Sequence, residues 1–256
     1  MLVLDGVSRR FGEQAAVSDV SLTIEPGSFV AVIGRSGAGK STMLRMINRL
    51  VEPSQGRILF GGMDVTQLRG QALHKWRSRA AMIFQQFNLA PRLDVLTNVL
   101  VGMSLEVPQV RRLLRLYWTH ERLRAAERLD ELGLLDKALA RAERLSGGEQ
   151  QRVAIVRALL QSPDIILADE PIASLDPRNS TIVMDTLRQI NRDRGITVLC
   201  NLHSLNVART YADRIVGLRS GRVVFDGPAE SLTPAAITEI YGTIAGADDQ
   251  SWAAAA

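Results

Sequence analysis

The pattern of hydrophobic and polar positions changes along the chain between short strand-like runs and longer helical segments. Residues 2–22 alternate between apolar and polar side chains, which is typical of half-buried strands. The run at 29–33 is apolar and β-branched, as expected of a strand covered on both faces. Further apolar runs at 164–168, 196–201 and 214–218 are separated by helical segments. Alternating strands and helices predict an α/β fold with a mainly parallel core sheet.

A longer helical region interrupts this alternation in the middle of the chain. Residues 110–134 are rich in Leu, Arg and Glu, with apolar residues at helical spacing and Gly133 placed to stop a helix. We therefore expect a mostly helical insertion at about 91–163. The end of the chain, from Ser251, has no periodicity, and we expect residues 247–256 to form a tail that is disordered or not native.

The composition is that of an ordinary globular protein, with 46% hydrophobic and 23% charged residues among 256. It argues against an intrinsically disordered chain, a collagen-like repeat and a disulfide scaffold. The net charge of +4 is too small to require a nucleic-acid partner. The single cysteine, Cys200, excludes an internal disulfide and a Cys-rich zinc site.

No stretch of the sequence supplies the roughly 20 mostly apolar residues that a membrane-spanning helix needs. The N-terminus lacks the basic start and long apolar region of a signal peptide. We expect a cytosolic protein that acts at a membrane only through a partner.

A glycine-rich loop follows the apolar run at 29–33 and precedes a helical segment. It matches the phosphate-loop pattern G-x-x-x-x-G-K-[ST] in full. Its backbone N–H groups can converge on phosphate oxygens, Lys40 can reach the β- and γ-phosphates of a nucleotide, and the Ser41 hydroxyl can bind Mg²⁺. The predicted ATP-binding residues here are Gly34, Arg35, Ser36, Gly37, Ala38, Gly39, Lys40, Ser41 and Thr42.

Two carboxylates end the apolar run that begins near residue 165. A phosphate loop needs a second Mg²⁺ anchor at the end of a neighbouring strand, and Asp169 fits that position. Successive strand residues point to opposite sides, so Glu170 is free to orient or deprotonate the attacking water. The alternative is that Glu170 is only a solvated acid, and the same Asp-Glu pair also occurs in helicase-type ATPases.

A third motif is Leu-Ser-Gly-Gly-Glu-Gln-Gln-Arg at 145–152, which precedes an amphipathic helix. Ser146 and Glu149 form the pattern of a capping box, so a well-capped helix start is one interpretation. A second anion site at a helix N-terminus is the other. The motif resembles the signature of the ATP-binding cassette (ABC) family, and the order of landmarks is similar to that family along nearly the whole chain.

The resemblance implies one ABC-type P-loop NTPase domain at 1–246. Its α/β core would comprise 1–90 and 164–246, including an N-terminal antiparallel β subdomain, and 91–163 would form the helical signature subdomain. It also implies ATP and Mg²⁺ as ligands and a head-to-tail homodimer. Site residues carried over from the family are the γ-phosphate ligands Ser146, Gly147 and Gly148, the interface residues Ser174, Leu175 and Asp176, the Mg²⁺ ligand and sensor Gln85 (with Gln86 as the alternative), the switch residue His203, and Phe11 stacked on adenine.

Finer features are similar to the ATPase subunit of bacterial phosphonate importers. They are Ala-Ser-Leu-Asp at 173–176, Asn-Leu-His at 201–203 and the run at 214–219. This resemblance implies a location at the cytoplasmic face of the bacterial inner membrane, permease subunits docked near 85–92, and indirectly an extracytoplasmic solute-binding protein, without nucleic acid. Alternatives are a cassette for amino acids, metals or lipoproteins, a soluble cassette acting on DNA or ribosomes, and a non-catalytic nucleotide-binding subunit.

A basic run from Arg111 to Arg128 has leucines and aromatic residues between its arginines. A solvated helical face with an apolar core side would explain it. An approach to anionic lipid headgroups or to the membrane subunit would explain it as well. Nucleic-acid binding is a third interpretation.

Overall fold

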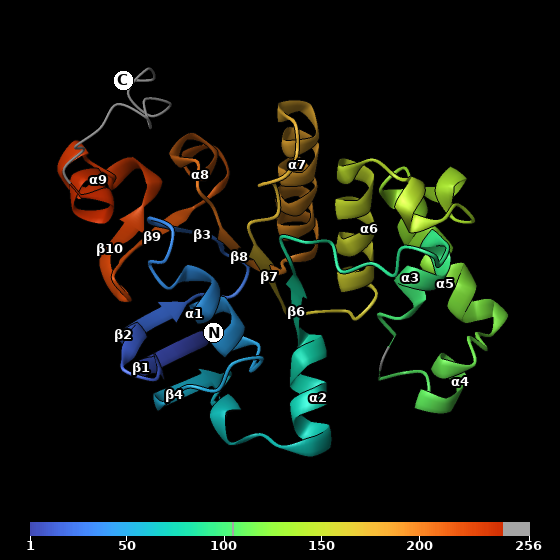
Figure 1. Cartoon of the computed structure of the whole chain (residues 1–256), viewed down its shortest axis with the longest axis horizontal. Helices are drawn as coiled ribbons and strands as arrows, with labels where there is room; N and C mark the ends of the chain where they lie inside the picture. The colour runs from blue at the N-terminus through green and yellow to red at the C-terminus, as the bar shows by residue number, and fades with distance from the viewer. Residues whose placement is uncertain (104, 243–256) are drawn as a thin grey trace. The chain divides into compact units, whose positions relative to one another are not determined.

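The computed structural model describes residues 1–103 and 105–242, which form two compact units. Unit 1 consists of residues 1–68 and the described part of the chain from Asn191 onward, and unit 2 is Arg69–Ile190. Figure 1 shows the helices and strands of each unit. The predicted tail at 247–256 lies outside the described residues.

Unit 1 begins with an antiparallel sheet of strand order β2-β1-β4-β5. Leu2 and Leu4 of β1 are 1% exposed, because alternate residues of a strand face the same side, and Val7 is also buried beyond a register shift between Leu4 and Val7. The predicted antiparallel β subdomain is therefore present. Its strands are β1 Leu2–Phe11, β2 Gln14–Ile24, β4 Gln55–Phe60 and β5 Met63–Asp64.

A second set of strands in unit 1 has the order β10-β9-β3-β8. β3 pairs in parallel with both β8 and β9, and every residue of β3 and β8 is buried, which explains their uninterrupted apolar sequence. The strands are β3 Phe29–Ile33, β8 Thr197–Asn201, β9 Arg214–Arg219 and β10 Arg222–Pro228. The helices of unit 1 are α1 Lys40–Ile47, α8 Leu205–Tyr211 and α9 Pro234–Tyr241, with short 3₁₀ turns at Val65–Gln67 and Ala229–Ser231.

Unit 2 pairs β6 (Ala80–Ile83) with β7 (Ile165–Asp169) in parallel. Its helices are α2 Gly70–Arg79, α3 Val95–Leu100, α4 Gln109–Leu113, α5 Thr119–Glu131, α6 Gly147–Leu159 and α7 Pro177–Arg194, whose last turn belongs to unit 1. Two 3₁₀ turns lie at Leu135–Lys137 and Ala142–Arg144. Helices α3, α5 and α6 pack side by side around a shared apolar core (Figure 1).

The helix stop expected at Gly133 is confirmed. Gly133 has φ +65°, and its N–H donates to Asp130 O while the N–H of Leu134 donates to Leu129 O. These two bonds are the Schellman motif that ends helices with a left-handed glycine. Within the described part of 91–163 all regular elements are helical, apart from an isolated bridge between Asp94 and Arg141.

Taken together, the strands and helices of the two units confirm the predicted α/β fold class with an antiparallel sheet and mainly parallel core strands. The boundaries expected at 90 and 163 remain a prediction. Among the described residues, no helix has the length and apolar character needed to cross a membrane.

Candidate nucleotide-binding and signature sites

The phosphate loop of unit 1 joins β3 to α1 with glycines at positions that exclude any side chain. A β-carbon on Gly34 would lie 2.2 Å from Leu218 O, and one on Gly39 would lie 2.3 Å from Ala16 O. Both glycines also have positive φ, +146° and +102°. Gly39 caps α1 without a side-chain hydrogen bond, so the first N–H groups of the helix are left to other acceptors.

Lys40 lies inside this loop and is only 4% exposed. Its ammonium donates to Gly34 O at 2.6 Å and to Arg35 O at 3.0 Å. The loop carbonyls therefore hold a buried positive charge where the N-terminus of α1 also carries partial positive charge. Such a site favours a polyanion.

Ser41, the next residue, contacts a strand that is distant in the sequence. Asn201 is the last residue of β8 and is fully buried, and its Nδ2 donates to Ser41 Oγ at 3.3 Å. Asn201 was not among the site residues predicted from the sequence. The feature of the sequence that could have found it is a polar residue at the end of an apolar run. The strand formed by that run pairs with the strand that leads into the phosphate loop.

Phe11 and His203 are both exposed residues of unit 1. Phe11 ends β1 with 49% of its surface exposed, and the Arg9 guanidinium lies 4.5 Å from the centre of its ring. Phe11 pairs with Gln14 in the β1–β2 hairpin, the same hairpin whose Ala16 carbonyl touches the phosphate loop at Gly39. His203 lies two residues after the end of β8 and precedes α8, which Ser204 caps by accepting the N–H of Val207.

The acidic pair of unit 2 lies at the end of β7. Asp169 is the last residue of the strand and is 2% exposed. Glu170 is half-buried and has φ +53°, a left-handed conformation that non-glycine residues rarely adopt. The side chains of Asp169 and Glu170 therefore differ in burial because the backbone turns at Glu170, and not because successive strand residues point to opposite sides. Strained backbone of this kind is concentrated at functional sites.

The signature segment starts α6 with the predicted capping box. Ser146 Oγ accepts the N–H of Glu149 at 3.3 Å, while the Glu149 carboxylate accepts the N–H and hydroxyl of Ser146, each at 2.8 Å. The hydrogen bond from the Ser146 N–H, and then that from its hydroxyl, hold the pKa of Glu149 below its ordinary value. The carboxylate is thus ionised at neutral pH at the helix N-terminus, where negative charge is stabilising.

The signature glycines pack against the segment 174–179. A β-carbon on Gly147 would lie 3.2 Å from Leu175 Cδ2, and one on Gly148 only 2.2 Å from Asn179 Oδ1. Asn179 is fixed in turn, because its N–H donates to Asp176 Oδ1 at 3.0 Å and its side-chain amide donates to Oδ2. Unit 2 therefore brings the signature and the predicted interface residues together. Asn179 was not anticipated from the sequence.

Gln85 is exposed just after β6, and the chain beyond it borders a groove of about 270 Å³. The lining residues are Gln86, Phe87, Asn88, Leu89, Pro91, Ala142, Glu143 and Gln150. The guanidinium of Arg157, on α6, fixes one wall by donating to Asn88 O at 2.6 Å and Phe87 O at 3.0 Å. Burial lowers the pKa of Arg157 from its ordinary value. Arg157 could not be predicted as a site residue from the sequence, because its position looks like any other position of a helix.

Comparison with known proteins identifies the family. A family model described as ABC transporter matches residues 17–173. The Phosphonates import ATP-binding protein PhnC 2 of Rhodopseudomonas palustris strain BisA53 is 62% identical, over 94% of this chain and 89% of that protein. The chain belongs to the ABC transporter family. The PhnC protein of Bradyrhizobium diazoefficiens is another similar ABC protein, with 61% identity over 94% of this chain and 90% of its own length.

Solved ABC structures share the fold. The dimeric post-hydrolysis state of the ATP-binding cassette MJ0796, bound to ADP and Pi, is 36% identical with a TM-score of 0.77, covering 90% of this chain and 99% of that one. The ADP conformation of the cassette MJ1267 is 26% identical with a TM-score of 0.81, covering 94% and 97%. These comparisons confirm the ABC resemblance stated from the sequence, and with it the ATP-binding character of the domain.

The oxygen donors of this ABC chain suit a small divalent cation. No group of three or more His, Cys, Asp or Glu side chains that could hold a metal occurs in the described part of the chain. Ser41 offers a hydroxyl already oriented by Asn201, and Asp169 offers a buried carboxylate. A hydroxyl, one carboxylate and nucleotide phosphates are the hard oxygen ligands that Mg²⁺ takes in such sites. Each unit therefore offers an oxygen ligand of the kind that the ion takes.

Proposed function

We propose that this chain is the ATP-binding and ATP-hydrolysing subunit of an ABC importer for phosphonates, phosphite or phosphate esters. One observation supports the assignment of ATP binding. A phosphate loop in which Gly34 and Gly39 cannot bear a side chain surrounds the buried Lys40. The solute class is supported by relatives that are 56–62% identical over at least 94% of this chain and are named as phosphonate import ATP-binding proteins.

ATP would bind with its phosphates on the loop residues 34–42. The Lys40 ammonium would exchange its carbonyl contacts for β- and γ-phosphate oxygens, which are stronger acceptors because they are charged. The exposed ring of Phe11 would stack on adenine, since phenylalanine offers an aromatic face without needing a hydrogen-bond partner.

Ser41, Asp169 and Gln85 would hold Mg²⁺ together with the phosphates. The ion would neutralise charge that develops on the transferred phosphoryl group. Asn201 keeps the Ser41 hydroxyl in place. The carboxylate of Asp169 is buried away from bulk water, which favours a role as an ion ligand.

Two copies would pack head to tail, so that Ser146, Gly147 and Gly148 of one copy meet the γ-phosphate on the phosphate loop of the other. The bare glycines at the N-terminus of α6 support this, because they leave backbone N–H groups accessible to an anion. Ser174, Leu175 and Asp176 would cross the same interface, and their contacts with the signature glycines would link the two elements.

Glu170 would orient and deprotonate the attacking water, and His203 would help to hold Glu170 and the γ-phosphate. The left-handed backbone at Glu170 supports a specialised role, because such strain persists only where the surroundings impose it. Loss of the γ-phosphate would remove the bridge between the copies and reopen the dimer.

The groove beside Gln85–Arg92 would receive a cytoplasmic segment of the permease, and a solute-binding protein outside the cytoplasm would select the solute. The chain would then work at the cytoplasmic face of the bacterial inner membrane, without nucleic acid. The groove itself and the guanidinium of Arg157 that fixes its wall support this docking place.

Nucleotide hydrolysis by the purified chain and by two variants tests the catalytic part. Lys40→Ala should abolish binding or turnover of ATP. Glu170→Gln should keep ATP binding, lose most of the turnover and accumulate a dimer on size exclusion. Unchanged hydrolysis by either variant would contradict the assignment of that residue.

The solute class needs a separate experiment. The chain is captured from its native membranes and the copurifying proteins are identified by mass spectrometry. Recovery of a phosphonate-type permease is expected. Recovery of another permease would overturn the solute class and leave the ATPase assignment intact.

A further inference from the structure

Helix α4 presents its apolar side to solvent. Val110, Leu113 and Leu114 follow the i, i+3, i+4 spacing of one helix face, and they are 68%, 81% and 60% exposed. Arg111 and Arg112, on the other side, are half-buried. A surface helix of a globular protein normally has the opposite orientation. An exposed apolar face of this kind marks a site of interaction.

Specific contacts fix the helix in this orientation. Both Nη atoms of Arg111 donate to the carboxylate of Glu121, at 3.1 and 2.8 Å, and the guanidinium stacks 4.1 Å from the centre of the Trp118 ring. Glu121 is 3% exposed and also accepts the N–H of Trp118 at 2.6 Å. Hydrogen bonds from Arg111 and Trp118 outweigh the effect of burial and hold the pKa of Glu121 below its ordinary value. The arginine side of α4 is thus tied to α5, which leaves the leucine side outward.

Further exposed apolar side chains follow α4 in the sequence. The chain after α4 reverses in a Schellman motif, in which Leu116 N–H donates to Arg111 O and Arg115 takes φ +54°. We call the resulting surface the leucine–arginine patch. Its exposed apolar members are Val110, Leu113, Leu114, Leu116, Trp118 and Leu123, and its exposed arginines are Arg115 and Arg122.

The charge of the patch is strongly positive. Residues 109–124 contain five arginines and one glutamate, and that glutamate is neutralised by Arg111. Glu106, nearby, pairs with Arg124. Within the described ranges, no carboxylate pairs with Arg115 or Arg122. The two exposed cations, Arg115 and Arg122, therefore remain to attract an anionic surface.

We infer that the leucine–arginine patch binds the surface of an anionic lipid bilayer. Leucine and tryptophan side chains would enter the boundary between headgroups and acyl chains, where tryptophan is favoured, and the arginines would meet lipid phosphates. A second copy of the patch is a poor occupant, because a symmetric contact would bring like charges together. This inference goes beyond the proposed function, in which the membrane is reached only through the permease.

Flotation of the purified full chain with lipid vesicles tests the inference without nucleotide or permease. Vesicles containing phosphatidylglycerol should carry the chain, binding should fall as salt is raised, and vesicles of phosphatidylcholine alone should carry much less. Two double variants should each weaken binding by roughly tenfold or more. One is Leu113→Glu/Leu114→Glu, and the other is Arg115→Glu/Arg122→Glu.

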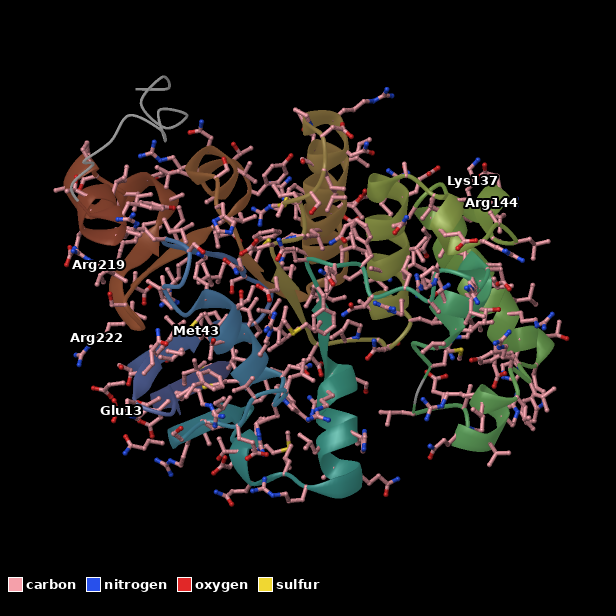
Figure 2. The ribbon with its side chains drawn as sticks, in the orientation of Figure 1. Glu13, Met43, Lys137, Arg144, Arg219 and Arg222 are labelled. Atoms are coloured by element: carbon pink, nitrogen blue, oxygen red, sulfur yellow. The ribbon has the colours of Figure 1, made fainter. Side chains whose placement is uncertain are left out.

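A matched control uses exposed residues outside the leucine–arginine patch. Leu139 is 84% exposed, and Arg144 extends from the 3₁₀ turn far from α4 (Figures 1 and 2). The variant Leu139→Glu/Arg144→Glu makes one substitution of each kind there, with a change in charge between those of the two test variants, and should still float. Circular dichroism of each variant verifies that the chain is folded.

Trp118 provides a direct signal of insertion. Its fluorescence should shift to shorter wavelength with anionic vesicles, and the shift should disappear in Trp118→Phe. Equal binding to both vesicle types, or undiminished binding by the Leu113→Glu/Leu114→Glu variant, would overturn the inference. Flotation only of vesicles that contain the permease would identify the patch as a protein interface and would also overturn it.

Discussion

The signature glycine Gly148 lies so close to Asn179 that a β-carbon on the glycine would come within 2.2 Å of Oδ1 and 2.8 Å of Cβ of the asparagine. Asp176 holds the asparagine through both its N–H and its side-chain amide. The start of α6 and the start of α7 are therefore fitted to each other at this point. In the proposed dimer, this contact would couple the γ-phosphate site to the interface segment.

Gly148→Ala should lower the free energy of unfolding by about 1–3 kcal/mol in the absence of nucleotide, because Asn179 and the backbone behind it must move. Gly147→Ala is the matched control. Its new methyl group meets the flexible end of Leu175 at 3.2 Å and makes an ordinary contact with Phe87 Cζ at 3.7 Å, so we expect a loss below about 1 kcal/mol. Urea denaturation measures both values. Asn179→Gly should restore part of the stability of the Gly148→Ala variant, and a failure to do so would contradict the steric explanation.

Asn201 positions the hydroxyl of Ser41, so its loss should affect the metal more than the nucleotide. In Asn201→Val, the affinity for ATP in the presence of EDTA should be unchanged, while the Mg²⁺ concentration needed for full binding should rise severalfold. Titration with a fluorescent ATP analogue measures both. Thr197→Val on the same strand, which removes a hydrogen bond to the N–H of Gly27, is the control. An equal effect of the two variants on the Mg²⁺ requirement would show that Asn201 acts only through stability.

Arg157 ties α6 to the loop that borders the groove. Arg157→Ala removes two hydrogen bonds to carbonyl oxygens and a largely buried side chain, and should cost about 2–4 kcal/mol of unfolding free energy. Arg157→Lys keeps the charge but not the forked geometry and should recover less than half of the loss. Arg128→Ala, which breaks an exposed pair with Glu131, should change stability by less than about 0.5 kcal/mol. Thermal or urea unfolding compares the three variants.

The capping box at Ser146 makes stability depend on the charge of Glu149. Because hydrogen bonds from Ser146 lower the pKa of Glu149 in the folded state, its contribution is present above the unfolded pKa of about 4.3 and is lost as the pH falls through the folded value. A glutamine side chain at this position could still accept the N–H of Ser146, so Glu149→Gln should cost at most about 1 kcal/mol at pH 7. The difference in unfolding free energy between wild type and Glu149→Gln should shrink below a pH of about 4.3. A difference that stays constant as the pH falls well below that value would show that the carboxylate charge contributes nothing.

The sequence by itself determined the features that depend on neighbouring residues. Three such features follow from local backbone geometry and from hydrogen bonds within a few positions. They are the strand, glycine loop and helix around Gly34 and Lys40, the capping box of Ser146 and Glu149, and the helix stop at Gly133. The same local motifs, in their order along the chain, carried the resemblance to ABC ATPases and the choice of candidate site residues.

Only the tertiary structure decided which distant segments meet. Three sets of contacts join residues separated by 31 or more positions. They are the fit of Asn179 against Gly148, the hydrogen bond from Asn201 to Ser41, and the two hydrogen bonds from Arg157 to the loop at Phe87. The outward direction of the apolar face of α4 was likewise decided by the tertiary structure. Helical spacing shows that the leucines share a face but not which way that face points. That direction depends on Glu121 of α5 holding Arg111 on the opposite side.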